Sequence, residues 1–549
     1  MTSKKQSPTP WTTTTEQEKY SKTRETTPSK FFTINFHFKY FIFFLISVTS
    51  WFFILFFFLP PTNLKHQPHR SSSSTKPIKS ILVVNHRRQR NLSKNVSSVY
   101  IYNLPPEFNL GLVEDCAHLN IYTNMCPHVA KRGLGQQLPL SDDGETGSGS
   151  GGAWFATHQF IAEMIFHARM ENHPHRTWDP ARASLFYVPF YGGLHASSKF
   201  REMNLTARDE LAVRLMDFLH RQPTWRKNNG KDHFMVLGRT AWDFMRSTES
   251  GPDFGANSLL NLPRVRSMSV LTVETNPWKK KTNSNQYGLP YPSYFHPSTS
   301  AQMLTWQTKV RKSNRSHLFS FIGAPRKGLE KAAIRDELIR QCGESTRCKL
   351  LQCNKDKNNK CYEPSEIMRV MTGSEFCLQA PGDSFTRRST FDAVLAGCVP
   401  VFFSPHTAYT QYEWFLPDNP EEYSVYIDEE EAMRAKRVIN VEEELLKIPR
   451  ERVEKMRKTV INLIPRLTYK HPNASDDGGG GFRDVVDVAF DALGRHFLGL
   501  HFKGTKKIVY MKLKDKQNLW ILLNLALSFY ETLRDRGSIT TSQDGEVYS

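Results

Sequence analysis

The sequence predicts an α/β protein with two domains, each built on a parallel sheet, that follow one membrane-spanning helix. Short apolar runs typical of buried strands alternate with amphipathic helical segments along most of the chain, and this pattern indicates parallel sheets with helices on both faces. The chain has 549 residues, which is enough for two such domains. Residues 40–59 carry no charged side chain and are long enough to span a bilayer.

The expected span divides the chain into a short N-terminal tail and a long C-terminal part. Residues 1–39 are rich in Thr, Ser and Lys, and we expect them to form a disordered cytosolic tail. Residues 60–98 are rich in Pro, Ser and basic residues, and we expect a flexible lumenal stem. A removed signal peptide is a weaker interpretation, because the apolar run is too long and lies too far inside the chain.

Lysine and arginine occur on both sides of the span, so they do not decide its orientation. All eight cysteines follow the span, as do the Asn-x-Ser/Thr sequons at Asn91, Asn95, Asn204, Asn314 and Asn473. N-glycosylation and an even number of cysteines both favour an oxidising lumenal compartment. The sequence therefore predicts a type II membrane protein.

The folded part is expected to begin with a strand at Val99 and to contain two domains, over 99–300 and 301–496. The boundary is placed at an aromatic and proline-rich connector near 288–300. Residues 497–549 form a lysine-rich and then polar tail that suggests no function. Apolar residues at helical spacing predict helices over 154–170, 207–219, 301–311, 329–341, 406–414 and 450–464.

The net charge of +19 is compatible with binding to nucleic acid, to a membrane surface or to an anionic substrate. The sequence contains no zinc-finger, RNA-recognition or helix-turn-helix pattern, so we do not expect a nucleic-acid partner. Cys353 and Cys361 flank a polar loop that a disulfide would close. A zinc site is less favoured there, because the cysteine cluster lacks histidines and paired Cys-x-x-Cys spacing.

The most informative stretch is 376–404, which reads as strand, glycine-containing loop, helix and strand. Arg387 and Arg388 fall in the first turn of that helix, where the helix dipole makes a cation unfavourable. A bound anion would reverse this effect, because loop N–H groups, dipole and guanidinium groups would converge on it, and a diphosphate fits well. The alternative is that Arg388 pairs with Asp392 at i+4 on a solvated face. The residues alone leave both interpretations open.

A lumenal, membrane-anchored α/β protein with a diphosphate-like site suggests a sugar-nucleotide transferase. A second loop, at 323–326, is also expected at the carboxyl end of a strand, where open α/β sheets bind ligands. The chain contains no Asp-x-Asp, which argues against a metal-held diphosphate. Arginines would instead neutralise the leaving diphosphate, so we expect no metal and no cofactor.

Several blocks of sequence resemble one known family in the same order. They are VYIYNLPPEFN (99–109), THQFIAEMIFHARM (157–170), DPARASLFYVPFYGG (179–193), DHFMVLGRTAWDF (232–244), GLPYPSYFHP (288–297), LFSFIGAPR (318–326), FCLQAPGDSFTRRSTFDAVLAGCVPVFF (376–403) and INLIPRL (461–467). The chain resembles the exostosin-type plant glycosyltransferases, and among them the MURUS-type xyloglucan galactosyltransferases. Residues after about 497 do not resemble that subgroup.

The resemblance implies an inverting enzyme of two facing Rossmann-like domains, of GT-B type, in the Golgi membrane. It implies galactose transfer from UDP-galactose to xylosyl side chains of xyloglucan, and association with other wall glycosyltransferases. It also implies a disulfide between Cys377 and Cys398. The alternatives are a related enzyme that uses UDP-galacturonic acid, and a non-catalytic protein that binds wall polysaccharide or organises a complex.

The resemblance also implies functional residues. The UDP-sugar site residues expected from it, with two residues of the glycine-containing loop, are Gly323, Arg326, Gly382, Ser384, Arg387, Arg388 and Asp392. An inverting transfer needs one general base, which we expect from the first domain. The candidates are Glu163, His233, Asp232 and His158. Each could instead be a buried structural residue, as could the aromatic residues Trp242, Tyr291 and Tyr294, which could stack on sugar rings.

Overall fold

The computed structural model describes residues 97–138, 152–247, 255–277, 285–326, 328, 332–354, 360–428, 439–474, 481–497 and 499. The expected membrane span at 40–59, the sequons Asn91 and Asn95, and nearly all of the tail lie outside these residues. Within the described ranges, no helix combines the length and the apolar character needed to cross a membrane.

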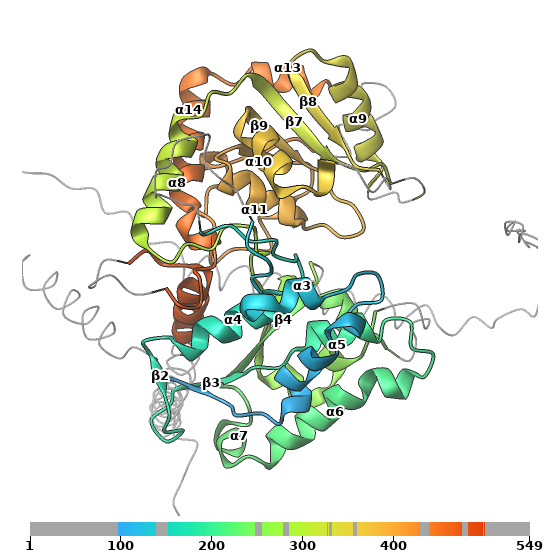
Figure 1. Ribbon diagram of the computed structural model, residues 1–549, viewed down its shortest axis with the longest axis vertical. Helices are drawn as coiled ribbons and strands as arrows, with labels where there is room; N and C mark the ends of the chain where they lie inside the picture. The colour runs from blue at the N-terminus through green and yellow to red at the C-terminus, as the bar shows by residue number, and fades with distance from the viewer. Residues whose placement is uncertain are drawn as a thin grey trace, which may run out of the picture. The chain divides into compact units, whose positions relative to one another are not determined.

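The first sheet has six parallel strands in the order β2-β1-β3-β4-β5-β6 (Figure 1). Its strands are β1 (Val99–Ile101), β2 (Arg176–Thr177), β3 (Leu185–Val188), β4 (His233–Thr240), β5 (Ser269–Glu274) and β6 (Gln286–Gly288). The strand order changes direction between β1 and β3. The helices of this part are α3 (Cys126–Val129), α4 (Ala162–Glu171), α5 (Gly192–Ser198), α6 (Leu205–Arg221) and α7 (Pro223–Asn228).

The second sheet has five parallel strands in the order β11-β10-β9-β7-β8. Its strands are β7 (His317–Gly323), β8 (Cys348–Gln352), β9 (Ser374–Gln379), β10 (Val399–Phe402) and β11 (Val425–Tyr426). Its helices are α8 (Ser300–Lys312), α9 (Ile334–Glu344), α10 (Pro364–Thr372), α11 (Arg388–Leu395), α13 (Val441–Leu446) and α14 (Arg450–Leu463). Here the order changes direction between β7 and β9. The predicted α/β class with parallel sheets is therefore confirmed.

Short 3-10 helices are also present, at Pro106–Phe108, Leu110–His118, Ala130–Gly133, Ala241–Phe244, Leu259–Asn261, Pro263–Ser267, Lys360–Tyr362, Pro405–Thr407, Pro420–Glu422 and Pro465–Leu467.

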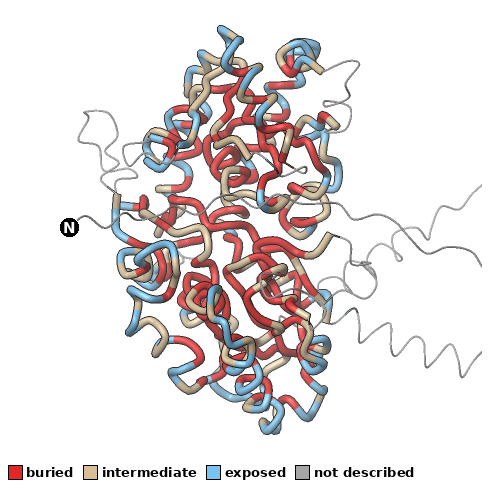
Figure 2. Tube along the Cα trace, turned by 90° about the vertical axis from the view of Figure 1, so that its right-hand side faces the viewer, coloured by how far each residue is buried: buried red, intermediate tan, exposed pale blue. Residues whose placement is uncertain are grey.

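Both sheets are apolar on both faces, as sheets covered by helices require. In the first sheet, Phe186 and Met235 face the cluster that contains α6, whereas Tyr187 and Phe234 face the cluster that contains α4. This alternation follows from the two-residue period of a strand. Figure 2 shows buried segments mostly in the interior of the described part of the chain and exposed segments mostly at its periphery. The cluster around α4 continues into the second domain, where Phe391 of α11 and Phe402 of β10 belong to it.

The start of one predicted helix and the whole of another are wrong, because burial rather than helical structure produced the apolar spacing there. The helix expected over 154–170 begins only at Ala162; Trp154 instead forms an isolated antiparallel bridge with Phe295. The segment 406–414 is mostly turns, although Tyr412 is fully buried and donates a hydrogen bond to the carbonyl of Val273 at 2.7 Å.

The end of the described chain packs on α4 of the first domain, although the sequence grouped it with the second. Residues 485–497 are helical. Arg169 in α4 lies 2.9 Å from buried Asp484, and His173 lies 3.5 Å from Asp487. The ring of Phe490 lies against His173 at 4.8 Å between centroids. The buried ion pair between Arg169 and Asp484, the contact of His173 with Asp487 and this ring contact attach the segment to the first domain.

Glu163 connects three elements of the first domain. Its Oε2 accepts hydrogen bonds from the N–H groups of Gly193 at 2.9 Å and Gly238 at 2.8 Å, and its Oε1 accepts from Leu194 at 2.8 Å. These bonds join α4 to α5 and to β4. Burial raises the pKa of Glu163 to about 7, although the three N–H donors favour the carboxylate.

We expect Glu163→Gln to destabilise the fold, because one amide oxygen cannot serve three N–H donors and each unsatisfied donor costs about 1–3 kcal/mol. Because the pKa of Glu163 is higher in the folded state than its ordinary value of 4.5, protonation of Glu163 favours the folded state. This contribution to stability is complete below pH 4.5 and is lost as the pH rises through about 7. The stability of the variant should lack this dependence on pH. Thermal unfolding from about pH 4 to about pH 8 measures both effects. Glu210→Gln, on the exposed face of α6, is the control. A Glu163→Gln protein with the parental melting temperature and the parental pH dependence would contradict this structural role of Glu163.

Candidate functional site

The loops after β7 and β9 lie side by side at the switch point of the second sheet. The two strands pair in parallel, with Phe319 opposite Phe376. The strand order changes direction between them, and open α/β sheets bind ligands in the crevice at such a point. The two loops singled out in the sequence, at 323–326 and in the glycine-containing part of 376–404 (381–388), therefore come together.

Arg335 in α9 joins these two loops. Its Nε donates to the carbonyl of Ala324 at 2.8 Å, and its Nη1 donates to the carbonyl of Ala380 at 3.3 Å. Burial, together with the positive charges of Arg387 and Arg326, lowers the pKa of Arg335 to about 10. The sequence did not single out Arg335, because it lies in an ordinary amphipathic helix.

Arg387 is the N-cap residue of α11 and lies in the wall of a cavity. Its Nε and Nη2 atoms are shielded from solvent and have no hydrogen-bond partner among the described residues. Burial lowers the pKa of Arg387, and the charge of Arg326 lowers it further. A shielded guanidinium without partners is unfavourable, and a bound anion would offset that cost.

Two glycines leave the room that the guanidinium groups occupy. A Cβ atom at position 382 would lie 1.4 Å from Nη2 of Arg387. A Cβ atom at position 323 would lie 2.2 Å from Nη2 of Arg335. Gly382 and Gly323 are therefore required by the close approach of arginine side chains from neighbouring elements.

The cavity beside Arg387 has a volume of about 540 Å³ and takes its walls from both sheets and the connector. Its lining residues are Gln159, Phe160, Arg239, Thr240, Trp242, Asp243, Gly255, Tyr291, Asp383, Ser384, Phe385, Thr386 and Arg387. Thr240 ends β4, so the first sheet also contributes the carboxyl end of a strand. The cavity thus joins the ligand-binding edges of both sheets.

The sequence missed Arg239 and Asp243, although both lie in a block that carries the family resemblance. Nε of Arg239 donates to Oδ2 of Asp243 at 2.8 Å, and its Nη1 donates to Oγ of Ser197 at 2.8 Å. The hydroxyl of Thr240 donates to the same Asp243 oxygen at 3.1 Å. Their position after a buried strand was the signal that could have identified them.

Glu274, at the end of β5 in the first domain, binds the loop of the second domain that leads to Arg387. Its Oε2 accepts from the backbone N–H of Thr386 at 2.7 Å and from the Thr386 hydroxyl at 2.6 Å. Its Oε1 accepts from Nε1 of Trp242 at 3.0 Å. The residue before Arg387 is therefore positioned by a buried carboxylate of the other sheet.

Arg388 and Asp392 lie away from the cavity lining, in the interface with the connector. Arg388 donates to the carbonyl of Thr157 at 3.1 Å and to the hydroxyl of Tyr294, and lies 3.5 Å from Oδ2 of Asp392. Asp392 accepts from the hydroxyl of Ser293 at 2.5 Å. The geometry favours the i+4 pair over a direct contact with ligand, but the pair is buried rather than solvated.

The four candidate bases also lie outside the cavity lining. Glu163 is enclosed by its N–H donors, as described above. Asp232 and His233 lie at the amino end of β4, opposite the ligand-binding edge, and His233 contacts Oδ1 of Asp232 at 2.8 Å. His158 accepts from the N–H of Phe160 at 3.2 Å, and burial lowers its pKa to about 3. The carboxylates that do line the cavity are Asp243 and Asp383.

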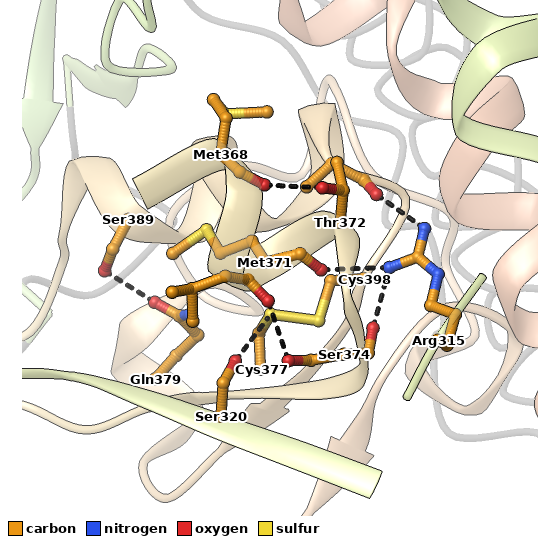
Figure 3. The surroundings of a disulfide bond; sticks show 12 residues. Arg315, Ser320, Met368, Met371, Thr372, Ser374, Cys377, Gln379, Ser389 and Cys398 are labelled. Carbon is orange, nitrogen blue, oxygen red and sulfur yellow. Dashed lines mark hydrogen bonds between the residues drawn. A yellow bond between two sulfur atoms is a disulfide. The ribbon is translucent and has the colours of Figure 1, made fainter. Parts of the chain in front are cut away.

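Figure 3 shows the disulfide between Cys377 in β9 and Cys398 just before β10. Beside it, Oγ of Ser389 donates to Oε1 of Gln379 at 2.6 Å, which ties the start of α11 to the end of β9. Arg315 donates to the carbonyl of Ser374 at 2.7 Å on the other side. The remaining disulfides are Cys116–Cys126, Cys342–Cys348 and Cys353–Cys361.

The other predicted residues lie at the rim of the site or on the surface. Nε of Arg326 lies 3.2 Å from Oδ1 of Asp383 and links the two loops. Ser384 lines the cavity and donates to the carbonyl of Thr386 at 3.3 Å. Among the described sequons, Asn204, Asn314 and Asn473 are exposed, and Oδ1 of Asn204 caps α6. Their glycosylation stays a prediction.

The chain is similar over most of its length to several proteins of Arabidopsis thaliana. The probable xyloglucan galactosyltransferase GT17 of Arabidopsis thaliana is 60% identical over 398 residues, which cover 72% of this chain and 82% of that protein. Xyloglucan galactosyltransferase MUR3 of Arabidopsis thaliana is 44% identical over 400 residues, or 72% of this chain and 61% of that protein. Xyloglucan-specific galacturonosyltransferase 1 of Arabidopsis thaliana is 37% identical over 415 residues, or 75% of this chain and 59% of that protein.

The exostosin GT47 domain matches residues 93–442, which include both sheets. This range contains the switch-point loops and every residue that lines the cavity. Together with the relative that is 60% identical over most of its own length, the match identifies the chain as a member of the exostosin GT47 family of glycosyltransferases.

Proposed function

We propose that this glycosyltransferase transfers galactose from UDP-galactose to xylosyl side chains of xyloglucan, with inversion at the anomeric carbon. The relatives support the reaction class, since MUR3 is a xyloglucan galactosyltransferase and GT17 a probable one. The observation that carries the donor side is the unpartnered Arg387 guanidinium at the switch point of the second sheet.

On the donor side, the diphosphate of UDP lies against Arg387. Arg335 keeps the two loops together, and Gly323 and Gly382 leave room for the guanidinium groups. As the bond to the sugar breaks, negative charge develops on the leaving diphosphate, and a preorganised cation in a shielded site stabilises that charge strongly. We propose that arginine supplies this stabilisation without a metal ion, in a GT-B arrangement of the two domains.

On the acceptor side, we propose Asp243 as the general base in place of the four earlier candidates. It lines the cavity from the first domain, and Arg239 and Thr240 hold its carboxylate. An acceptor hydroxyl oxygen attacks the anomeric carbon, its proton passes to Asp243, and the bond between that carbon and the diphosphate oxygen breaks as UDP leaves.

A neutral donor sugar fits the cavity better than a uronic acid. The arginines that line it are Arg239 and Arg387. Arg239 already pairs with Asp243, and Arg387 is required for the diphosphate. A sugar carboxylate would need a further cation, because a buried charge without a partner is costly. The galacturonosyltransferase among the relatives keeps UDP-galacturonic acid as the second candidate donor.

We propose that the apolar segment at 40–59 spans the Golgi membrane and that the residues after it lie in the lumen. Every described cysteine is in a disulfide, and disulfides persist in oxidising compartments. The exposed sequons at Asn204, Asn314 and Asn473 agree with this location.

The reaction is tested with the full-length chain, xyloglucan oligosaccharides and a panel of UDP-sugars, each with and without EDTA. We expect a mass gain of one hexose with UDP-galactose alone, unaffected by EDTA. Selective transfer from UDP-galacturonic acid would replace the proposed donor, and loss of transfer in EDTA would contradict metal independence. If no donor supports transfer although UDP binds, the proposed acceptor is wrong.

Replacing Arg387 with alanine should weaken UDP binding roughly 10- to 100-fold, the effect of one charge-assisted contact, without lowering the melting temperature. Arg388→Ala is the matched control on the adjacent residue. It should keep UDP binding but lower the melting temperature, because it leaves buried Asp392 without its cation at a cost of about 3 kcal/mol. Calorimetric titration with UDP and thermal unfolding separate the two roles. Equal loss of UDP affinity in both variants would contradict the assignment of UDP binding to Arg387 and of a structural role to Arg388.

Asp243→Asn should lower kcat roughly 10²- to 10⁴-fold with UDP affinity unchanged, because the amide keeps the shape but cannot accept the proton. Asp383→Asn replaces the other carboxylate of the cavity lining and is the control. Steady-state rates with saturating donor and acceptor measure the effect. Parental kcat in Asp243→Asn would exclude it as the base.

A further inference from the structure

A second cavity of about 530 Å³ lies in the first domain, away from the residues assigned to the transfer reaction. It runs along β1 and the following loop and is closed by the C-terminal half of α4 and the segment after β2. Its lining residues are Tyr100, Ile101, Tyr102, Asn103, Leu104, Pro106, Asn109, Leu110, His167, Glu171, Arg176 and Trp178.

Trp178 is the most unusual residue of this cavity, because it is 77% exposed although its orientation is constrained. The guanidinium of Arg176 lies 3.6 Å from the ring centroid of Trp178. Arg176 is itself anchored, since its Nη1 donates to the carbonyl of Glu171 at 2.8 Å. One indole face is therefore covered and held, and the high exposure leaves the opposite face open to a ligand. A rigid aromatic face of this kind binds flat apolar surfaces at low entropic cost.

Polar groups in the cavity are also available. The side chain of Asn103 is exposed, and neither its amide nor its backbone N–H has a hydrogen-bond partner within the described ranges. The indole N–H of Trp178 likewise has none among the residues that the structure describes. An open aromatic face beside unused amide and N–H groups matches a sugar ring, which presents an apolar C–H face and a rim of hydroxyls.

The charges favour a neutral ligand. The charged side chains of the lining, Glu171 and Arg176, have opposite signs. Burial lowers the pKa of His167 to about 4, so this ring is uncharged at neutral pH. The net charge of the chain is +19, but this cavity has no excess of cations for a phosphate or a polyuronate.

A peptide strand fits less well. β2 pairs only with Val99 and Tyr100, so β1 presents a free edge beyond them. That edge is short, because Pro105 and Pro106 follow at once and lack N–H donors, and an added strand needs a longer row of backbone groups.

The two ends of α4 lie near two different cavities, the transfer cavity and this second one. Phe160, just before this helix, lines the transfer cavity, and Glu171 at its end lines the second one. α4 has 10 residues and therefore spans roughly 15 Å. Both cavities also include residues that follow the carboxyl ends of strands in the same sheet, β4 in one case and β1 in the other. A chain of linked sugars can bridge such a distance, whereas a single sugar cannot.

We propose that this cavity, with Trp178 as its platform, is a second carbohydrate-binding site that holds a neutral stretch of the acceptor polysaccharide at a distance from the reacting xylosyl group. This inference rests on the proposed function for the identity of the polysaccharide. The site increases the affinity for long acceptors by adding contacts on the same chain, and leaves the chemical step unchanged.

The test compares Trp178→Ala with Tyr122→Ala in the full-length chain. Tyr122 is a matched control, because it is 70% exposed, also lies beneath an arginine, Arg201, and is absent from the cavity lining. Affinity electrophoresis through soluble xyloglucan should give a roughly 3- to 10-fold weaker apparent affinity for Trp178→Ala, about the value of one aromatic contact. Tyr122→Ala should migrate as the parent, and retardation by the polyanion polygalacturonan, which reflects the net charge of +19, should be equal for all three proteins.

Steady-state rates supply a second readout. For Trp178→Ala we expect a KM for polymeric xyloglucan that rises by the same factor, with unchanged kcat and unchanged KM for UDP-galactose. The KM for an acceptor too short to reach from one cavity to the other should not change. A higher KM for the polymer with unchanged kcat and unchanged KM for the short acceptor distinguishes loss of a remote binding site from damage to the active site.

Unchanged retardation and unchanged polymer KM in Trp178→Ala would overturn the inference, as would an equal loss in Tyr122→Ala. A change in sedimentation behaviour without a change in polysaccharide retardation would overturn it in favour of a protein interface. If no donor supports transfer but retardation still depends on Trp178, the carbohydrate site stands and the proposed reaction fails.

Discussion

The site depends on two guanidinium groups held close together where the loops after β7 and β9 meet. Arg335 bonds to the carbonyls of both loops, whereas Arg387 has shielded nitrogen atoms that bond to no described residue. Burial lowers the pKa of both groups, and the positive charge of Arg387 further lowers the pKa of Arg335, so an anion bound beside them would offset an unfavourable arrangement. Gly323 and Gly382 belong to the same constraint, because any side chain at either position would displace one of the two groups.

The first domain also positions this arrangement. Glu274 bonds to both the N–H and the hydroxyl of Thr386, directly before Arg387. Arg388, directly after it, bonds to Thr157 and Tyr294. Adjacent residues at the start of a helix point about 100° apart around its axis, so one arginine faces the cavity and the next faces the domain interface. The loop before α11 cannot shift relative to the first sheet without breaking these buried contacts. Binding of a ligand by this loop would therefore be physically coupled to the arrangement of the two domains.

The first domain combines two different kinds of surface. Around Asp243 it presents paired charges next to the proposed diphosphate site, which is suited to proton transfer. Around Trp178 it presents an open aromatic face and unused amide groups with balanced charge, which is suited to binding without chemistry. α4 connects both surfaces, and Glu163 and Asp484 fix that helix to β4 and to the end of the described chain. One buried helix thus sets the distance between the two surfaces.

The sequence by itself determined the α/β class, the parallel sheets, the two switch-point loops and the family, because these depend on apolar periodicity, glycine positions and ordered motifs. It also singled out Arg387. The sequence could not separate Arg387 from Arg388, identify Arg335, or place Asp232 and His233 at the end of β4 away from the cavity. Those distinctions depend on which end of a strand or which side of a helix faces the cavity. Only the tertiary structure decided them, since it brings β4, β7, β9 and α9 together from segments far apart in the chain. For the same reason, the buried apolar spacing of 406–414 resembled a helix until its contacts with β5 were known.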